Sequence, residues 1–295
     1  MLSTDPSLPD ALRDAPDALS STPDGGSTAA VPRAPSAPRV TRVAVERPSR
    51  FGAPVRVRTS DGLLAARIVS RDGTRAEVAL VAGGAMLLGG DAVVIAVRVD
   101  AGCTLTLTDV GGTVAYDCDG RECRWDADVR LGQGACLTWA GLPFVVADGA
   151  DVRRTTTARL GSDARLTLRE TVVLGRSGER GGRITLRTDI ADDVGPILVE
   201  ELTAAGDRPV PGVLGGHLVI DTLTAVRGAG PGSPGMTMHL LPGNAFAWQQ
   251  VHGHVGPESP GDAVTLRLER GGTLTRWLGP ATHLSPLEPD PSEDR

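Results

Sequence analysis

The chain has 295 residues, 40% of them hydrophobic, which is enough for a sizeable core in one large domain or two closely joined ones. Its formal net charge of -6 and its few aromatic residues, with one Tyr and three Phe, argue against nucleic-acid binding. No apolar run approaches the roughly 20 residues needed to cross a bilayer, so we expect a soluble protein that does not enter a membrane.

The first 38 residues have the composition of a disordered arm. They are rich in Pro, Ser, Ala and Asp and contain no aromatic residue, so burial cannot offset the entropy lost on ordering. They also lack the basic start and the uninterrupted apolar segment of a secretory signal peptide. We therefore expect a cytoplasmic protein.

From residue 40 onward, alternating apolar residues predict a series of strands separated by turns. The turn signals are Asp61-Gly62 and Asp72-Gly73. The predicted strands lie within 40–45, 55–57, 63–69 and 76–81.

Three segments then carry one repeated pattern, in which alternation leads into a Gly/Asp-rich turn and resumes after it. They are Val97–Leu107, Val129–Trp139 and Ala158–Leu168, and a weaker echo runs from Leu266 to Leu274. A period of about thirty residues predicts stacked β-units that share one core, because a single hairpin cannot bury its own apolar face. An ordinary antiparallel meander with similar turns is the alternative.

The remaining elements complete an all-β prediction. Further strands are predicted within 168–174, 183–187, 197–202 and 217–226, and a short helix at 239–252. The predicted organisation is a disordered arm at 1–38, a β-domain at 39–284 and an acidic, flexible tail at 285–295. The predicted fold class is mainly β, with stacked sheets in a solenoid-like arrangement and few short helices.

The sequence contains no recognisable catalytic motif. There is no GxxxxGK[ST] phosphate loop, no GxSxG elbow and no HExxH motif, and the absence of Lys excludes lysine-based catalysis. Sequence alone does not show whether two acidic residues lie close enough for glycoside chemistry.

Four cysteines could form two disulfides or a metal site, but reduced structural thiols are the expectation in a reducing compartment. Cys103 and Cys136 are interpreted as equivalent turn-to-strand positions of two repeats. Cys118 and Cys123 bracket a loop with a spacing at the loose end of zinc-ligand patterns.

The histidines include one candidate chelating pair. His252 and His254 could chelate a metal with a third ligand, although solvated side chains are the simpler interpretation. His217 opens an apolar strand and is expected to be a packed or capping residue.

Four polar residues interrupt or end apolar patterns: Asp91, Thr113, Glu170 and Glu200. A carboxylate that faces a protein interior is costly unless it is paired, hydrated or bound to a cation. Each could equally point into solvent, so their role depends on context beyond periodicity.

Two motifs provide that context through a family resemblance. Gly83-Gly84 followed by Gly89-Gly90-Asp91 resembles the paired-glycine and aspartate stretch of the urease accessory protein UreD family, also called UreH. Glu170 followed by Leu174-Gly175-Arg176 and Gly178-Glu179 resembles a second stretch of that family. Further matches in the same order are Trp139, Gly149-Ala150, Leu198-Val199-Glu200 and Thr222-Leu223. The resemblance covers about residues 40 to 226.

The resemblance implies a β-rich, non-enzymatic scaffold with stacked sheets in a helicoid arrangement. Proteins of this family bind the urease apoprotein and UreF, which recruits the GTPase UreG, and nickel passes through the assembly into urease. The resemblance therefore implies no tightly bound cofactor or metal, only a nickel ion in transit.

Family motifs also imply roles for individual residues. Asp91, Thr113, Glu170 and Glu200 match polar positions that line a hydrated passage for nickel, where oxygen ligands relay the ion without trapping it. Structural or interface roles are implied for Gly89, Gly90, Gly175, Arg176 and Glu179.

The chain departs from the family pattern in two places. Gly112–Asp117 lacks the two basic positions usual there, and Trp139–Pro143 is not followed by the usual carboxylate. The rival interpretations are a β-solenoid carbohydrate-active enzyme that uses two carboxylates, and a generic β-rich interaction module. The absence of a signal peptide and the scarcity of aromatic residues for sugar stacking count against the enzyme.

Overall fold

The computed structural model describes residues 39–47, 50, 52–230 and 263–288. The chain divides into two units, Met1–Ala37 and Pro38–Arg295, and every described residue lies in the second. The predicted arm at 1–38, the predicted helix at 239–252, His252, His254 and the end of the predicted tail lie outside the described residues.

The described residues form two sheets. The first sheet has the strand order β14-β13-β11-β8-β5-β1-β2, and the second has the order β16-β17-β15-β12-β9-β6-β4-β3, with β10 paired to both β12 and β7. In the first sheet the strands are β1 (Val40–Glu46), β2 (Arg56–Ser60), β5 (Ala92–Val99), β8 (Cys123–Leu131), β11 (Asp151–Leu160), β13 (Arg183–Asp192) and β14 (Gly195–Ala205). In the second they are β3 (Leu64–Asp72), β4 (Arg75–Ala82), β6 (Thr104–Asp109), β7 (Thr113–Ala115), β9 (Cys136–Ala140), β10 (Phe144–Val146), β12 (Arg165–Leu174), β15 (Val219–Arg227), β16 (Val264–Arg267) and β17 (Thr273–Gly279).

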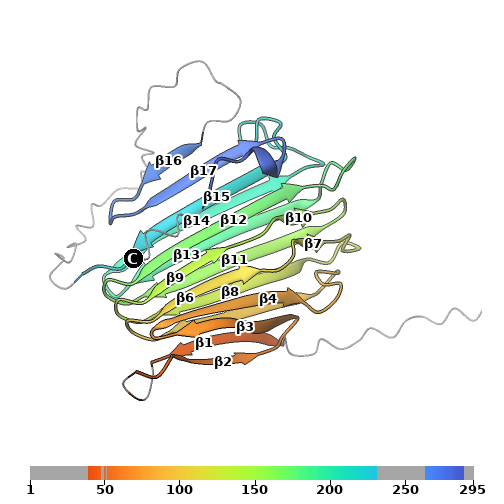
Figure 1. Ribbon diagram of the computed structural model, residues 1–295. Helices are drawn as coiled ribbons and strands as arrows, with labels where there is room; N and C mark the ends of the chain where they lie inside the picture. Colours follow the sequence, from red (N-terminus) through yellow and green to blue (C-terminus); the bar gives the residue numbers. More distant parts are fainter. Residues whose placement is uncertain (1–38, 48–49, 51, 231–262, 289–295) are drawn as a thin grey trace, which may run out of the picture. The chain divides into compact units, whose positions relative to one another are not determined.

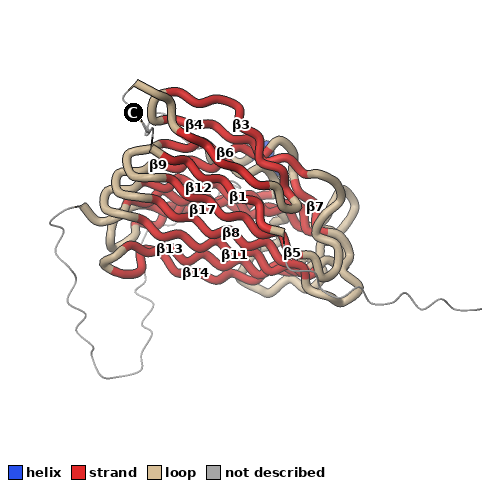
Figure 2. Tube along the Cα trace, turned by 90° about the horizontal axis from the view of Figure 1, so that it is seen from below, coloured by secondary structure: helices blue, strands red, loops and turns tan. Residues whose placement is uncertain are grey.

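The central strands wind as a solenoid. From β4 to β13 the long strands alternate between the two sheets, and neighbours within each sheet run parallel. Figure 1 shows the strands following one another in chain order, from orange through green to blue, and Figure 2 shows the turns gathered at the two ends of the strands. The prediction of stacked β-units is therefore confirmed for the three repeats, and the antiparallel meander is wrong there.

Antiparallel pairs close the solenoid at both ends. They are β1 with β2, β3 with β4, β13 with β14, β12 with β15, and β15 and β16 with β17. The weak echo at Leu266–Leu274 belongs to the β16–β17 hairpin, so it is not a further parallel repeat. The only helical segment among the described residues is the 3-10 turn Thr282–Leu284.

The Gly/Asp-rich turns of the repeats stack on one another. The amide of Gly102 donates to the carbonyl of Gln133 at 2.9 Å, and the amide of Gly134 donates to that of Ser162 at 2.8 Å. At Gly161 the chains approach so closely that an added Cβ would lie 2.7 Å from the backbone nitrogen of Gln133. The repeated glycines therefore serve the stacking of successive coils.

The register corrects one detail of the repeat alignment. Cys136 pairs with Thr104 on β6 and with Arg165 on β12, so Cys103 and Cys136 are not equivalent. Cys103 precedes Thr104 by one residue and is fully buried, whereas Cys136 is only partly buried.

Alternate residues of both sheets point into one shared core. Its aromatic centre is an edge-to-face contact between Trp125 on β8 and Phe144 on β10, with ring centroids 5.7 Å apart. A second, smaller cluster combines Val219, Trp277 and Leu287. Leu287 belongs to the predicted flexible tail, so the packed part of the chain continues beyond residue 284.

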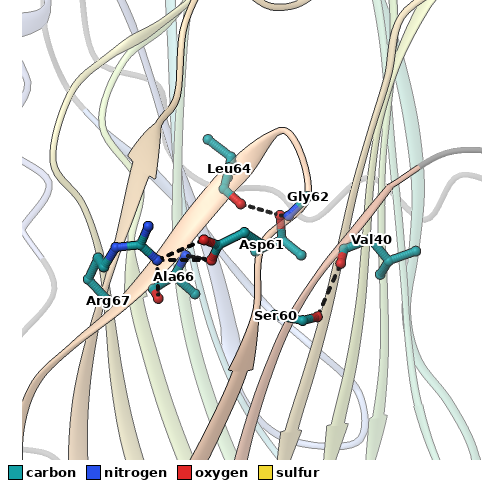
Figure 3. A network of polar contacts seen from close by, with 8 residues as sticks. Val40, Ser60, Asp61, Gly62, Leu64, Ala66 and Arg67 are labelled. Carbon is teal, nitrogen blue, oxygen red and sulfur yellow. Dashed lines mark hydrogen bonds and ion pairs between the residues drawn. The ribbon is translucent and has the colours of Figure 1, made fainter.

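The passage from β2 to β3, which moves the chain from one sheet to the other, is fixed by polar contacts (Figure 3). The carboxylate of Asp61 accepts bonds from the Arg67 side chain at 2.9 Å and from the Ala66 amide at 3.1 Å. The amide of Gly62 donates to the carbonyl of Leu64 at 3.0 Å. The predicted Asp61-Gly62 turn is thus the first crossing between the sheets.

Gly161→Ala tests the stacking of the turns. The added methyl group has to displace the backbone of the neighbouring coil, so we expect a loss of about 1 to 3 kcal/mol in the free energy of unfolding, measured by urea denaturation of the full chain. Gly84→Ala is the control, because no atom lies within 4 Å of its added Cβ. Equal urea midpoints for the two variants would show that close stacking of the turns is unimportant.

Candidate functional site

A row of polar side chains crosses the core between the two sheets. The pairing of adjacent strands in the first sheet places three residues side by side: Thr156 on β11, Thr188 on β13 and Glu200 on β14. In the same way Glu170, Thr222 and Arg276 are neighbours on β12, β15 and β17 of the second sheet. Most residues two positions away on these strands are apolar core residues, such as Ala158 beside Thr156 and Leu168 beside Glu170, whereas Arg154 and Thr224 are buried polar exceptions. We call these six residues, together with Arg154, the polar layer.

The inner part of the polar layer joins the sheets through Glu170. Its Oε1 accepts a bond from Nε of Arg154 at 3.0 Å and one from the hydroxyl of Thr156 at 3.2 Å. The side chains of Arg154 and Glu170 are only 9% and 15% exposed. The guanidinium carbon of Arg154 lies 5.2 Å from the ring centroid of Trp125 and 5.1 Å from that of Phe144, within range of cation–π attraction.

The outer part of the polar layer joins the sheets through Glu200. Both of its carboxylate oxygens accept bonds from Arg276, each at 2.8 Å. Nε of the same arginine donates to the hydroxyl of Thr222 at 3.1 Å. The side chains of Arg276 and Glu200 are 22% and 29% exposed, so this end of the polar layer is open to water.

Asp109 adds a third carboxylate near the inner pair. It accepts bonds from Nε1 of Trp139 at 3.3 Å and from the amide of Leu142 at 3.1 Å. Burial raises the pKa of the Asp109 carboxyl, and these two bonds and the charge of Arg154 oppose that rise only in part. The sequence lacks the usual family carboxylate after Trp139–Pro143. Asp109, at the end of β6, places a carboxylate at this same loop.

One buried donor in this region is unsatisfied. Nε1 of Trp125 has no hydrogen-bond partner among the described residues. Such a group inside a protein calls for a polar partner such as water. The guanidinium of Arg154 lies over the ring of the same tryptophan. The unsatisfied donor therefore belongs to an aromatic ring that contacts the Arg154–Glu170 pair.

Two of the predicted passage residues lie outside the polar layer. Asp91 sits in the loop before β5, where its side chain accepts a bond from the amide of Leu88 at 3.0 Å. Thr113 opens β7, and its amide donates to the carbonyl of Pro143 at 3.0 Å. The structure therefore brings Glu170 and Glu200 into one layer, and places Asp91 in a loop and Thr113 at the start of β7, both outside it.

The predicted structural residues lie in tight loops at the ends of the strands. An added Cβ at Gly89 would lie 2.3 Å from the carbonyl oxygen of Cys118, and Gly90 and Gly175 have φ values of 87° and 79°. Glu179 pairs with Arg176, whose side chain and amide lower the pKa of the Glu179 carboxyl to about 2. A role for these residues in binding partners stays a prediction.

The thiol chemistry of the cysteines disfavours metal binding. All four are free thiols, and burial together with the neighbouring Cys118 thiol raises the pKa of Cys123 to about 12. A protonated thiol is a poor metal ligand. Within the described residues no group of three or more His, Cys, Asp or Glu side chains could hold a metal ion.

His217 lies in a turn, where its amide donates to the carbonyl of Leu214 at 2.9 Å. No helix among the described residues has the length and apolarity needed to cross a membrane.

Sequence reasoning missed Arg154, Arg276 and Asp109. Arg154 was detectable, because strict alternation in Val152–Leu160 places it on the apolar face. Arg276 lay in a segment for which no strand was predicted. Asp109 lies two residues beyond the predicted segment Val97–Leu107, and only the fold shows that it ends β6 and that its carboxylate accepts a bond from Trp139.

Comparison with known proteins identifies the family. The model of the UreD urease accessory protein family matches residues 40–284, well beyond the 40–226 suggested by motifs. The chain is 41% identical over 208 residues to urease accessory protein UreD 1 of Streptomyces griseus, a match covering 70% of this chain and 81% of that protein. It is 31% identical over 238 residues to urease accessory protein UreD 2 of Saccharopolyspora erythraea, covering 77% and 83% of the two chains.

Asp109→Asn tests the buried carboxylate. Because the pKa is raised by folding, the folded state binds more protons than the unfolded state above the ordinary value of 3.8. The wild type should therefore lose stability as pH rises from this value through the raised pKa, and the variant should lack that decline. The measurement is the urea midpoint as a function of pH.

Asp61→Asn is the control with the opposite sign. The ion pair with Arg67 lowers the pKa of Asp61, so its stabilising effect is present at neutral pH and disappears as pH falls through the lowered pKa. Parallel pH profiles for the wild type and Asp109→Asn would contradict the burial argument.

Proposed function

The chain belongs to the family of UreD urease accessory proteins, and we propose that it is a cytoplasmic, non-enzymatic scaffold for urease maturation. It binds the urease apoprotein and UreF, and UreG joins through UreF. Nickel passes through it as cargo, without a tightly bound cofactor. It binds neither nucleic acid nor a membrane.

The polar layer is the observation that carries the nickel role. It supplies carboxylate and hydroxyl oxygens between two apolar faces, and oxygen ligands suit a hydrated divalent cation that must be released again. Burial and the neighbouring Cys118 thiol raise the pKa of Cys123 to about 12, which disfavours the thiolate form that would hold the ion too tightly. A passage needs several weak sites, and the polar layer offers Glu200 at its open end and Glu170 at its buried end.

Asp109 extends this passage towards a surface suited to a partner. The carboxylate lies beside Val110 and Leu142, whose side chains are 62% and 40% exposed. Exposed apolar residues that lie close together are typical of protein contact sites. In this proposal Asp91, in the loop before β5, and Thr113, at the start of β7, line the same route.

A carbohydrate-active enzyme fits the site less well. General acid and base catalysis needs carboxylates that face a cleft, whereas Glu170 and Glu200 are each held by an arginine between two sheets. A generic interaction module would leave the polar layer without a role.

Glu200→Gln tests the passage. The change keeps the shape of the side chain and removes the charge, so we expect several-fold lower nickel-dependent urease activation when the variant is co-expressed with urease and UreF. Co-purification of the complex should be unaffected. Glu170→Gln should behave in the same way.

Glu201→Gln is the matched control. Glu201 is the next residue on β14, faces the opposite side and pairs with Arg187 at 3.3 Å on the surface. It should activate urease normally. Loss of the complex with Glu200→Gln would assign a structural role to the residue, and full activation without this chain would refute the proposed function.

A further inference from the structure

The carboxylates of the polar layer are already occupied by resident cations. Glu200 receives two bonds from Arg276, and Glu170 receives one from Arg154, so each carboxylate faces one guanidinium. A free carboxylate between apolar sheets would carry a large desolvation cost and would attract a divalent ion strongly. Pairing with the arginines lowers both the desolvation cost of the carboxylates and their attraction for a divalent ion.

We infer that Arg154 and Arg276 set the metal affinity of the passage by competing with a divalent cation for Glu170 and Glu200. This inference rests on the proposed function and adds the residues that keep the ion from being trapped. A cation binds by displacing a guanidinium from its carboxylate and leaves when the guanidinium returns.

The surroundings of Arg154 favour such an exchange. It holds Glu170 through one bond only, while the faces of Trp125 and Phe144 lie about as close to its guanidinium as cation–π contacts require. Asp109 lies near enough for the charge of Arg154 to act on it. A displaced Arg154 therefore keeps both an aromatic and an anionic neighbour.

The surroundings of Arg276 suggest an entry point. Its bidentate pair with Glu200 is about one quarter exposed, so water and ions reach it from outside. Thr222, which already contacts Arg276, can hold the guanidinium while the carboxylate changes partner.

Nickel binding to the full chain tests the inference directly. Arg276→Gln removes the competitor and leaves Glu200 free, so calorimetric titration of the untagged protein with Ni²⁺ should show one additional site. The variant should bind Ni²⁺ about tenfold or more tightly than the wild type does, which corresponds to roughly 1.4 kcal/mol of binding free energy. The double variant Glu200→Gln/Arg276→Gln should lose the additional site.

Arg187→Gln is the matched control, because it frees Glu201 on the outer face of the same strand pair. This surface carboxylate is surrounded by water, so no additional nickel site is expected. If Arg276→Gln fails to fold, Arg276→Lys keeps the charge without the planar fork and should give an intermediate affinity.

The inference is overturned if a folded Arg276→Gln or Arg276→Lys protein binds Ni²⁺ no more tightly than the wild type. It is also overturned if the double variant keeps the additional site. Failure of the proposed function looks different: Arg276→Gln gains the site, but Glu200→Gln activates urease normally. Loss of urease activation in Glu200→Gln without tighter Ni²⁺ binding in Arg276→Gln would support the passage. It would contradict the competition between arginine and the cation.

Discussion

The pairing of charges between the two sheets is the constraint on which the rest of the structure depends. Glu170 and Glu200 are charged residues in a mainly apolar core, and each would be strongly unfavourable there without its arginine. Both pairs link opposite sheets. The two sheets are therefore held in register by polar contacts as well as by packing, and a shift of one strand would break them.

The solenoid makes such a polar layer possible. Parallel neighbours place residues of successive coils side by side, so one polar position per coil produces a continuous row, as at Thr156 and Thr188. The antiparallel strands β14 and β17 then bring Glu200 and Arg276 to the end of the same row. Coils towards β5 and β6 have Ile95, Val97, Leu105 and Leu107 at their core positions, and Asp109 at the end of β6 is a polar exception. The mainly apolar coils around β5 and β6 therefore contribute chiefly to stability, whereas the later coils provide most of the candidate site.

Most of the fold was predictable because it follows from local patterns. Period-two alternation and Gly/Asp-rich turns identified the repeats, and their spacing predicted the stacked coils that the structure has. The terminal hairpin β16–β17 was misread as a weak repeat, because alternation alone does not distinguish parallel from antiparallel neighbours. The site was predictable only in part. Glu170 and Glu200 stood out as acidic residues in apolar strands, whereas their partners Arg154 and Arg276 are set by the pairing of distant strands.

The charge balance of the polar layer explains how one site can be both buried and permissive to a cation. Glu170 and Glu200 are matched by Arg154 and Arg276, so the four groups sum to zero and the resting layer needs no counterion. Among the described residues Asp109 has no bonded cation, and its raised pKa reflects the cost of its negative charge in that place. An arriving divalent ion would lower that cost, because its charge favours the ionised carboxylate. In the proposed passage, the same electrostatics that makes an empty polar layer tolerable also makes a loaded one tolerable, which favours release of the ion.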